Sequence, residues 1–270
     1  MDKWRLVVSE PLPGAMNMAL DEAVMLAVSH GLAPPTIRFY QWWPAAVTLG
    51  YFQSLNKEID RQACQDAGID IVRRLTGGRA VLHHQEFTYS LVTPEGHPKV
   101  AGSVLQSYLS ISHGLLNGLT RIGVKADLSA GTRAQEHNSA ACFDAPSWYE
   151  LAVERKKLSG SAQSRRHGCL LQHGSIPVQN NTDSLFSILR FPNEEIRAKA
   201  KAFFTAKATS LEDILGYRPD FAKLSEVFTQ GFSAGLGITL DEQRFLPEEI
   251  AWATDLCYNK YYTNEWNARK

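Results

Sequence analysis

Cysteine is scarce in this chain, and the spacing of the cysteines matches no metal-binding motif. The 270 residues contain four cysteines: Cys64, Cys142, Cys169 and Cys257. None of them forms a paired motif, which suits free thiols in a reducing compartment, so we expect a cytoplasmic protein. Cys169 lies four residues before His173, but on the strand expected there the two side chains do not converge, and further ligands are lacking. No metal site is therefore predicted.

Long apolar runs and an excess of one charge are also absent. No run approaches the ~18 apolar residues that a membrane-spanning helix needs. The N-terminus "MDKWRLVVSEPLPG" lacks the small-residue cleavage site of a secretory signal. Lysine plus arginine equals aspartate plus glutamate, 28 against 28, which argues against polyanion binding as the main task. We expect a monomer with neither nucleic acid nor membrane among its partners.

What is present favours an α+β fold. Apolar residues recur at helical spacing over residues 17–31, 103–122 and 220–237, with Asn17 as a plausible cap and Gly31 as a stop for the first. Short β-rich segments with turn residues at their ends lie between these helices. They cover residues 36–40, 46–52, 69–75, 79–83, 87–92, 148–154 and 168–178.

The segments alternate without a regular βαβ rhythm, so we predict mixed, mostly antiparallel sheets flanked by helices. No linker or repeat divides the chain. We therefore expect a single domain over residues 1–270, with a core of about 33–246 and a short helical tail at 247–270.

The first motif that carries chemistry is "RRLTGGRAVLHH", residues 73–84. Adjacent glycines after a strand let backbone approach a ligand closely, and the arginines offer fixed positive charge. A glycine hairpin with solvated arginines is the simpler interpretation of the motif alone. His83, which follows, makes a binding role more plausible.

Two further motifs follow in "KKLSGSAQ" and "GCLLQHGSIPV". In the first, Lys157 precedes a small glycine-containing run that can lie against a ligand, although a basic surface turn fits equally well. Lys156 would point to the opposite face of the strand and be solvated. In the second, a buried strand carries His173 and Gly174, and a lone histidine of this kind is more often a core residue than a catalyst.

Taken in order, "RRLTGGRAVLH", "KLSGSA" and "LLQHGS" resemble the biotin/lipoate ligase and octanoyltransferase superfamily. "NMALDEA" and "TLGYFQ" are similar to its lipoate branch, so the resemblance covers most of the chain. It implies the catalytic-domain fold of that superfamily.

The cysteine decides which branch is resembled. Some octanoyltransferases carry the nucleophile after the "HG" strand, but "VQNNTDSLFSILRFP" at 178–192 holds no cysteine. Cys142 lies instead in "ACFDAPSWYEL", before the lysine motif. This arrangement resembles the octanoyltransferases that modify the glycine cleavage H protein. Cys169 is a rival nucleophile, but its place within an apolar strand favours a packed thiol, and Cys64 and Cys257 read as structural.

The resemblance implies a two-step reaction. Lys157 would face Cys142 and lower the pKa of its thiol, because a nearby ammonium favours the thiolate. The thiolate would attack octanoyl-acyl carrier protein, and a lysine of the acceptor domain would then take the acyl group as an amide. Amide formation from a thioester is downhill, so neither ATP nor another cofactor is expected. This agrees with the absence of a GxxxxGK[ST] loop.

The resemblance also implies a set of binding residues. Backbone N–H groups at the glycines are candidate oxyanion donors, and the arginines near them, including Arg79, Arg165 and Arg166, are candidate docking groups for acidic protein substrates. Val81 and Leu82 are possible parts of the acyl slot. The substrate-binding candidates are Arg73, Thr76, Gly77, Gly78, His83, Gly160, Ser161, Ala162, His173 and Gly174.

Three other readings stay open at this point. An ATP-dependent lipoate–protein ligase would not need Cys142, although Arg79 and His84 depart from the glycine and acidic residue common in ligases. An amidotransferase would move octanoyl between two lipoyl domains. A protein that only binds a lipoyl group would show no acyl transfer.

Overall fold

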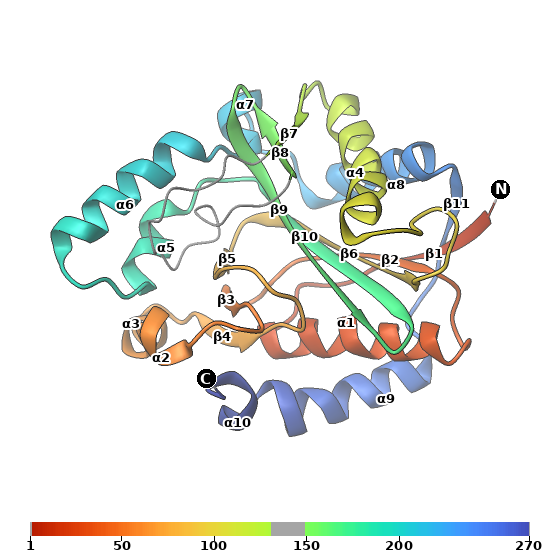
Figure 1. Ribbon diagram of the computed structural model, residues 1–270, viewed down its shortest axis with the longest axis horizontal. Helices are drawn as coiled ribbons and strands as arrows, with labels where there is room; N and C mark the ends of the chain where they lie inside the picture. The colour runs from red at the N-terminus through yellow and green to blue at the C-terminus, as the bar shows by residue number, and fades with distance from the viewer. Residues whose placement is uncertain (1, 131–148, 270) are drawn as a thin grey trace.

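The computed structural model describes residues 2–130 and 149–269. Its described part contains an eight-stranded sheet with the order β11-β1-β2-β6-β10-β9-β8-β7 and a three-stranded sheet with the order β4-β3-β5 (Figure 1). The strands are β1 (Asp2–Val8), β2 (Thr36–Tyr40), β3 (Ala46–Leu49), β4 (Asp70–Arg73), β5 (Val81–His83), β6 (Glu86–Pro94), β7 (Asp127–Ala130), β8 (Tyr149–Val153), β9 (Lys156–Arg166), β10 (Cys169–Pro177) and β11 (Ile238–Glu242).

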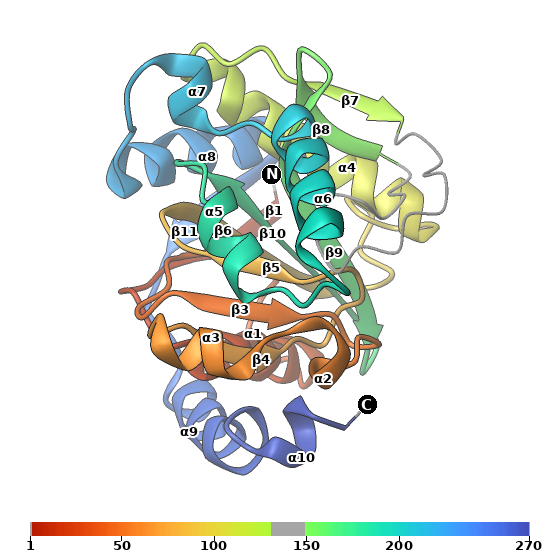
Figure 2. The ribbon, with the colours of Figure 1, turned by 90° about the vertical axis from the view of Figure 1, so that its left-hand side faces the viewer.

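Helices flank both sheets. They are α1 (Gly14–Ser29), α2 (Leu55–Glu58), α3 (Arg61–Asp66), α4 (Val104–Arg121), α5 (Thr182–Ile188), α6 (Glu194–Lys207), α7 (Leu211–Leu215), α8 (Phe221–Leu236), α9 (Pro247–Leu256) and α10 (Asn264–Asn267), with a π-helical turn at Cys257–Tyr261. Figure 1 shows α4 and α8 over one side of the large sheet and α1 on the other, with α9 packed outside α1. Figure 2 shows α5 and α6 beside the small sheet, against which α5 packs.

The pairing confirms the predicted fold class. β2, β6, β10, β9, β8 and β7 pair antiparallel in turn, while β1 is parallel to both β11 and β2. In the small sheet, β3 is parallel to β4 and antiparallel to β5. Antiparallel pairs therefore predominate in a mixed α+β arrangement.

Strand alternation in β2 separates a hydrophobic core from a polar layer. Ile37 and Phe39 belong to the core that α4 and α8 cover. Arg38 and Tyr40, on the opposite side of the strand, donate hydrogen bonds to Asp21 of α1. This alternation places Arg38 beneath α1, on the side where the pocket described below lies.

The three helices predicted from apolar spacing correspond to α1, α4 and α8, and one detail of the prediction was wrong. Ser103 caps α4 and Asp220 caps α8, close to the predicted starts of these helices. Asn17, however, is not the cap of α1, because the helix begins after Pro13. The Asn17 amide instead donates to the backbone carbonyls of Leu12 and Gln41, at 3.0 Å each. Asn17 was predicted as a cap because an asparagine before an apolar helical pattern is typical of one, but it bridges two loops instead.

The tail begins with α9 at Pro247, as the sequence predicts. Whether residues 1–270 form one domain stays a prediction. Among the described helices, none combines the length and apolar character needed to cross a membrane.

Candidate active site

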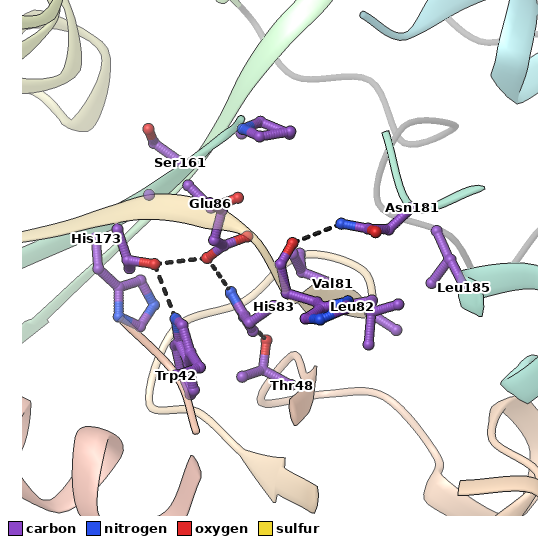
Figure 3. A pocket seen from close by; sticks show the side chains of 18 of the residues that line it. Trp42, Thr48, Val81, Leu82, His83, Glu86, Ser161, His173, Asn181 and Leu185 are labelled. Atoms are coloured by element: carbon purple, nitrogen blue, oxygen red, sulfur yellow. Dashed lines mark hydrogen bonds and ion pairs between the residues drawn. The ribbon is translucent and has the colours of Figure 1, made fainter. Parts of the chain in front are cut away.

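A pocket opens between the two sheets, and residues of both line it. Its empty volume is about 1040 Å³, including the space that opens to solvent, and its wall is mainly apolar (Figure 3). This size suits a small organic ligand. The lining includes Met18, Tyr40, Trp42, Thr48, Arg74, Gly78, Ala80, Val81, Leu82, His83, His84, Glu86, Thr88, Gly160, Ser161, Ala162, His173, Gly174, Ser175, Asn181, Leu185, Phe204 and Thr209.

The pairing of β9 with β10 places two of the predicted motifs, "KLSGSA" and "LLQHGS", side by side in the wall of the pocket. In the β9–β10 pair, Ala162 lies opposite His173, Ser161 opposite Gly174 and Gly160 opposite Ser175. A Cβ on Gly174 would lie 2.8 Å from both the Gly160 carbonyl oxygen and the Tyr89 ring. Glycine is therefore required for the strands to approach this closely, and the two motifs depend on each other.

The glycine turn forms another part of the wall. Gly78 has φ +94°, a conformation that favours glycine. A Cβ on Gly50, in the "TLGYFQ" segment, would collide with the Gly78 carbonyl. Tyr51 N–H also donates to the Thr76 carbonyl at 2.8 Å. The two glycine-containing segments are thus packed backbone against backbone, which explains why both carry glycine.

His173 links this turn to α1. Its Nε2 lies 2.7 Å from Thr76 Oγ1, and its Nδ1 lies 3.0 Å from Asp21 Oδ2. Burial lowers the pKa of His173 below its ordinary value, although Asp21 opposes the shift. Burial raises the pKa of Asp21, but the hydrogen bond to His173 and the charge of Arg38 outweigh it, so that pKa is lowered overall. The arrangement holds a neutral imidazole against an ionised carboxylate.

A second buried histidine, His83, belongs to a hydrogen-bond network that the sequence did not predict. His83 Nδ1 lies 2.6 Å from Glu86 Oε1 and its Nε2 lies 2.9 Å from Thr48 Oγ1. Its ring stacks on Trp42 with centroids 4.0 Å apart. Figure 3 shows Glu86 near the middle of the pocket. The sequence signal for Glu86 was its place just before a predicted strand, Thr48 opened the "TLGYFQ" motif without an assigned role, and Trp42 carried no signal.

Of the predicted arginines, Arg73 does not contribute to the lining. Its fully buried guanidinium donates to the backbone carbonyls of Gly50, Tyr51, Gln53, Trp266 and Asn267, at 2.7–3.2 Å. These contacts tie the turn after β3 to the C-terminal segment. They give Arg73 a structural role in place of the predicted contact with substrate, which nothing in this geometry supports.

Thr76 and Gly77 lie next to the lining and not in it. Thr76 is fully buried and orients His173, while the Gly77 carbonyl accepts from Arg74 Nη2 at 2.8 Å. Arg165 donates to Gly102 and Ser107 on the far side of β9. The predicted docking role of the surface arginines stays a prediction.

Lys157 is buried, at 7% exposed, near the base of β9. It lies outside the lining, but its backbone pairs with Ala208, and its carbonyl accepts from the N–H of Thr209, a lining residue, at 3.0 Å. Cys142, its predicted partner, is outside the described residues, as is the loop that carries it.

The three described thiols are buried, and their pKa values are raised by that burial. The pKa is about 12 for Cys64 and about 11 for Cys257, and that of Cys169 is also raised. Thiols of this kind are poor nucleophiles at neutral pH. In the described part of the chain no three His, Cys, Asp or Glu side chains are grouped to hold a metal ion.

Comparison with known proteins identifies the family. Residues 13–233 match the lipoyl protein ligase A/B catalytic domain. The chain belongs to this family. Two similar curated proteins are octanoyltransferase LipM of Brevibacillus brevis, 44% identical, and octanoyltransferase LipM of Kyrpidia tusciae, 45% identical, and each alignment covers 100% of both chains.

The fold has a solved counterpart. A chain from the structural analysis of a bipartite lipoate protein ligase and its E2 lipoyl domain from Thermoplasma acidophilum superposes with a TM-score of 0.82. It is 26% identical, and the match covers 99% of this chain and 97% of that one. The superfamily and fold that the motifs indicated are therefore confirmed.

Proposed function

We propose that this family member is an octanoyltransferase of lipoate biosynthesis. It moves octanoyl from octanoyl-acyl carrier protein to a lysine of a lipoyl-domain protein, the glycine cleavage H protein. The observation that carries the proposal is the similarity over the full length of the chain to proteins named octanoyltransferase LipM. A cytoplasmic location and a single domain complete the proposal.

The electrostatics of the pocket support a route without nucleotide. A bound triphosphate is normally held by lysines, arginines or metal ions. Among the described lining residues, Arg74 is the sole arginine or lysine. Its guanidinium already donates to Thr76, to both oxygens of Thr48, and to the carbonyls of Gly77 and Arg79. An apolar wall without a further cation suits an acyl chain better than a polyphosphate.

The thioester route assigns the first step to Cys142. Its thiolate attacks the octanoyl carbonyl of the carrier protein and displaces the carrier thiolate, which takes a proton from solvent, and an octanoyl-enzyme is left. Lys157 favours the thiolate by its positive charge, since an opposite charge within a few ångströms lowers the pKa of an acid. The high pKa values of Cys64, Cys169 and Cys257 leave Cys142 as the thiol best suited to this step.

The pocket residues position the acyl group. The close pairing of Gly160–Ala162 with His173–Ser175 leaves room against the strand backbone. His173 and Thr76 fix the glycine turn, whose backbone N–H groups are the candidates for stabilising the oxyanion of each tetrahedral intermediate.

The test compares two donors in the presence of purified glycine cleavage H protein. We expect octanoyl-acyl carrier protein to modify the acceptor without ATP, and free octanoate with ATP and Mg²⁺ to give no product. The reverse pattern would identify a ligase. Transfer from an octanoylated lipoyl domain, with no transfer from the carrier protein, would identify an amidotransferase, and binding without any transfer would identify a lipoyl-group binding protein.

A further inference from the structure

Glu86 places a carboxylate in the wall of the pocket, and one of its two oxygens accepts no hydrogen bond within the described part of the chain. Its side chain is 3% exposed. Oε1 lies 2.6 Å from His83 Nδ1 and accepts from Thr88 Oγ1 at 2.5 Å, as the dashed lines in Figure 3 show. Oε2 accepts no hydrogen bond from any residue that the structure describes.

Glu86 Oε2 opens on the pocket and is not sealed from it, so a ligand in the pocket can reach this oxygen and donate a hydrogen bond to it. Arg74, the cation of the described lining, donates to other groups and not to Glu86. The unfilled oxygen therefore points to a ligand that brings its own donor, and the charge of the carboxylate favours a cation.

The surroundings narrow the chemistry of that cation. Val81, Leu82, Leu185 and Phe204 also line the pocket, and three of them belong to one buried apolar cluster. Under the proposed function the octanoyl chain takes part of this apolar wall, and a carboxylate in the same pocket matches a primary alkylammonium, whose N–H groups seek an anionic acceptor. A lysine side chain has this form.

We infer that Glu86 is the subsite for the ammonium of the acceptor lysine, and that its Oε2 takes the proton which that amine must lose. The inference rests on the proposed function, which supplies an acyl thioester and a lysine acceptor. Glu86 then acts as the general base of the second half-reaction.

The step balances in protons and electrons. The ammonium passes one proton to Oε2, and the nitrogen lone pair forms a bond to the thioester carbonyl carbon. The tetrahedral intermediate collapses as the carbon–sulfur bond breaks, and the departing thiolate takes the second proton from nitrogen. The products are the amide, a free thiol and a protonated Glu86, which returns its proton to solvent.

Neighbouring groups hold the carboxylate in place. Thr88 Oγ1 accepts a hydrogen bond from the indole N–H of Trp42 at 2.8 Å and donates one to Glu86 Oε1. Oε1 is therefore already hydrogen-bonded, and Oε2 is left for the ligand. The titratable groups that share the lining with Glu86 are Tyr40 of β2, Arg74 after β4, His83 of β5, His84 after β5, and His173 of β10.

The first experiment uses enzyme that already carries octanoyl and follows a single turnover onto the acceptor protein from pH 6 to 9. A free lysine amine has a pKa of about 10.4, so roughly one in 2,500 is deprotonated at pH 7. With Glu86→Gln, which keeps size and an acceptor oxygen, we expect the rate at pH 7 to fall by about 100-fold or more and to rise tenfold per pH unit. The exposed Glu226→Gln variant is the matched control and should behave as wild type.

Wild type alone also tests the inference. A tenfold rise per pH unit in wild type would mean that the amine loses its proton in solution, and would overturn the assignment, as would an unchanged rate in Glu86→Gln. If wild type never becomes acylated by the carrier protein, the proposed function fails instead.

A binding measurement separates these two failures, because it needs no acyl group. n-Pentylammonium should raise the Tm of wild type and leave that of Glu86→Gln unchanged, while uncharged 1-pentanol treats both proteins alike. Equal stabilisation of the two proteins by the ammonium would show that Oε2 faces only water, and the subsite would be rejected.

Discussion

His173 and Asp21 form the polar contact on which the glycine turn depends. His173 lines the pocket and Asp21 does not, and Asp21 also accepts from Arg38, Tyr40 and Ser90 at 2.8–3.1 Å. Replacing His173 removes one hydrogen-bond partner from both Asp21 and Thr76, so the geometry of the turn and the stability of the protein are coupled at this residue.

This contact predicts a dependence of stability on pH. The pKa of His173 is lower in the folded protein than the ordinary 6.5, so the unfolded chain binds the extra proton first. Stability is therefore complete above about pH 6.5 and is lost as the pH falls below it. The lowered pKa of Asp21 acts in the same direction at lower pH, below its ordinary 3.8.

The variant His173→Gln should be less stable at pH 7.5 by about 1–3 kcal/mol, because Asp21 and Thr76 lose a partner. Its stability should also fall less between pH 6.5 and 5 than that of wild type. Urea denaturation at each pH measures both quantities. An unchanged pH slope in the variant would show that another group, such as His97, whose pKa burial also lowers, dominates the acid response.

At the scale of elements, apolar spacing predicted the long helices α1, α4 and α8 and most of the strands, but not the short helices such as α2, α5 and α7. Spacing did not predict β1 or β11, whose pairing joins residues over 230 positions apart, as Asp2 with Ile238. It also gave no sign of how closely α4 and α8 approach. That contact depends on glycines in both helices, and glycine within a helix is by itself only an unfavourable residue.

Gly235 in α8 provides a test of that contact. A Cβ there would lie 2.5 Å from the Gly114 backbone nitrogen of α4, where no side chain can rotate away. Gly235→Ala should destabilise the protein by about 1–3 kcal/mol, although alanine is the better helix former by up to ~1 kcal/mol. Gly96→Ala, with open space around it, is the control and should change stability by no more than about 0.5 kcal/mol. A more stable Gly235→Ala protein would contradict the packing.

For the molecule as a whole, two ion pairs, one of them fully buried, join the tail to the rest of the chain. Arg5 of β1 meets Glu249 of α9, with side chains 1% and 0% exposed. Lys260 and Tyr261 both bind Glu22 of α1 at 2.7 Å. These contacts are the physical basis for expecting one cooperative unit.

Arg5→Met should therefore cost about 3–5 kcal/mol, because it leaves Glu249 buried without its countercharge. Most of that loss should return in the double variant Arg5→Met/Glu249→Leu. Calorimetry of wild type should show one transition. Two separate transitions would mean that the tail unfolds by itself.

The candidate site was predictable where chemistry sits in short motifs. The glycine turn, the β9 segment and His173 with Gly174 were found because each motif is local, and strand register then brings them together. Trp42, Thr48 and Glu86 were not found, because their relation to His83 exists only after folding. The burial of Arg73 outside the lining was not predictable for the same reason, since its carbonyl partners come from distant segments around Gly50 and Asn267.

The central claim is the thioester on Cys142, and intact-protein mass spectrometry tests it most directly. Wild type, Cys142→Ala and Cys169→Ala are incubated with octanoyl-acyl carrier protein in the absence of ATP. We expect wild type and Cys169→Ala to gain one octanoyl group that hydroxylamine removes, and Cys142→Ala to gain none. An octanoyl group on Cys142→Ala, or no group on wild type while ATP and free octanoate support acylation of the acceptor, would contradict the account.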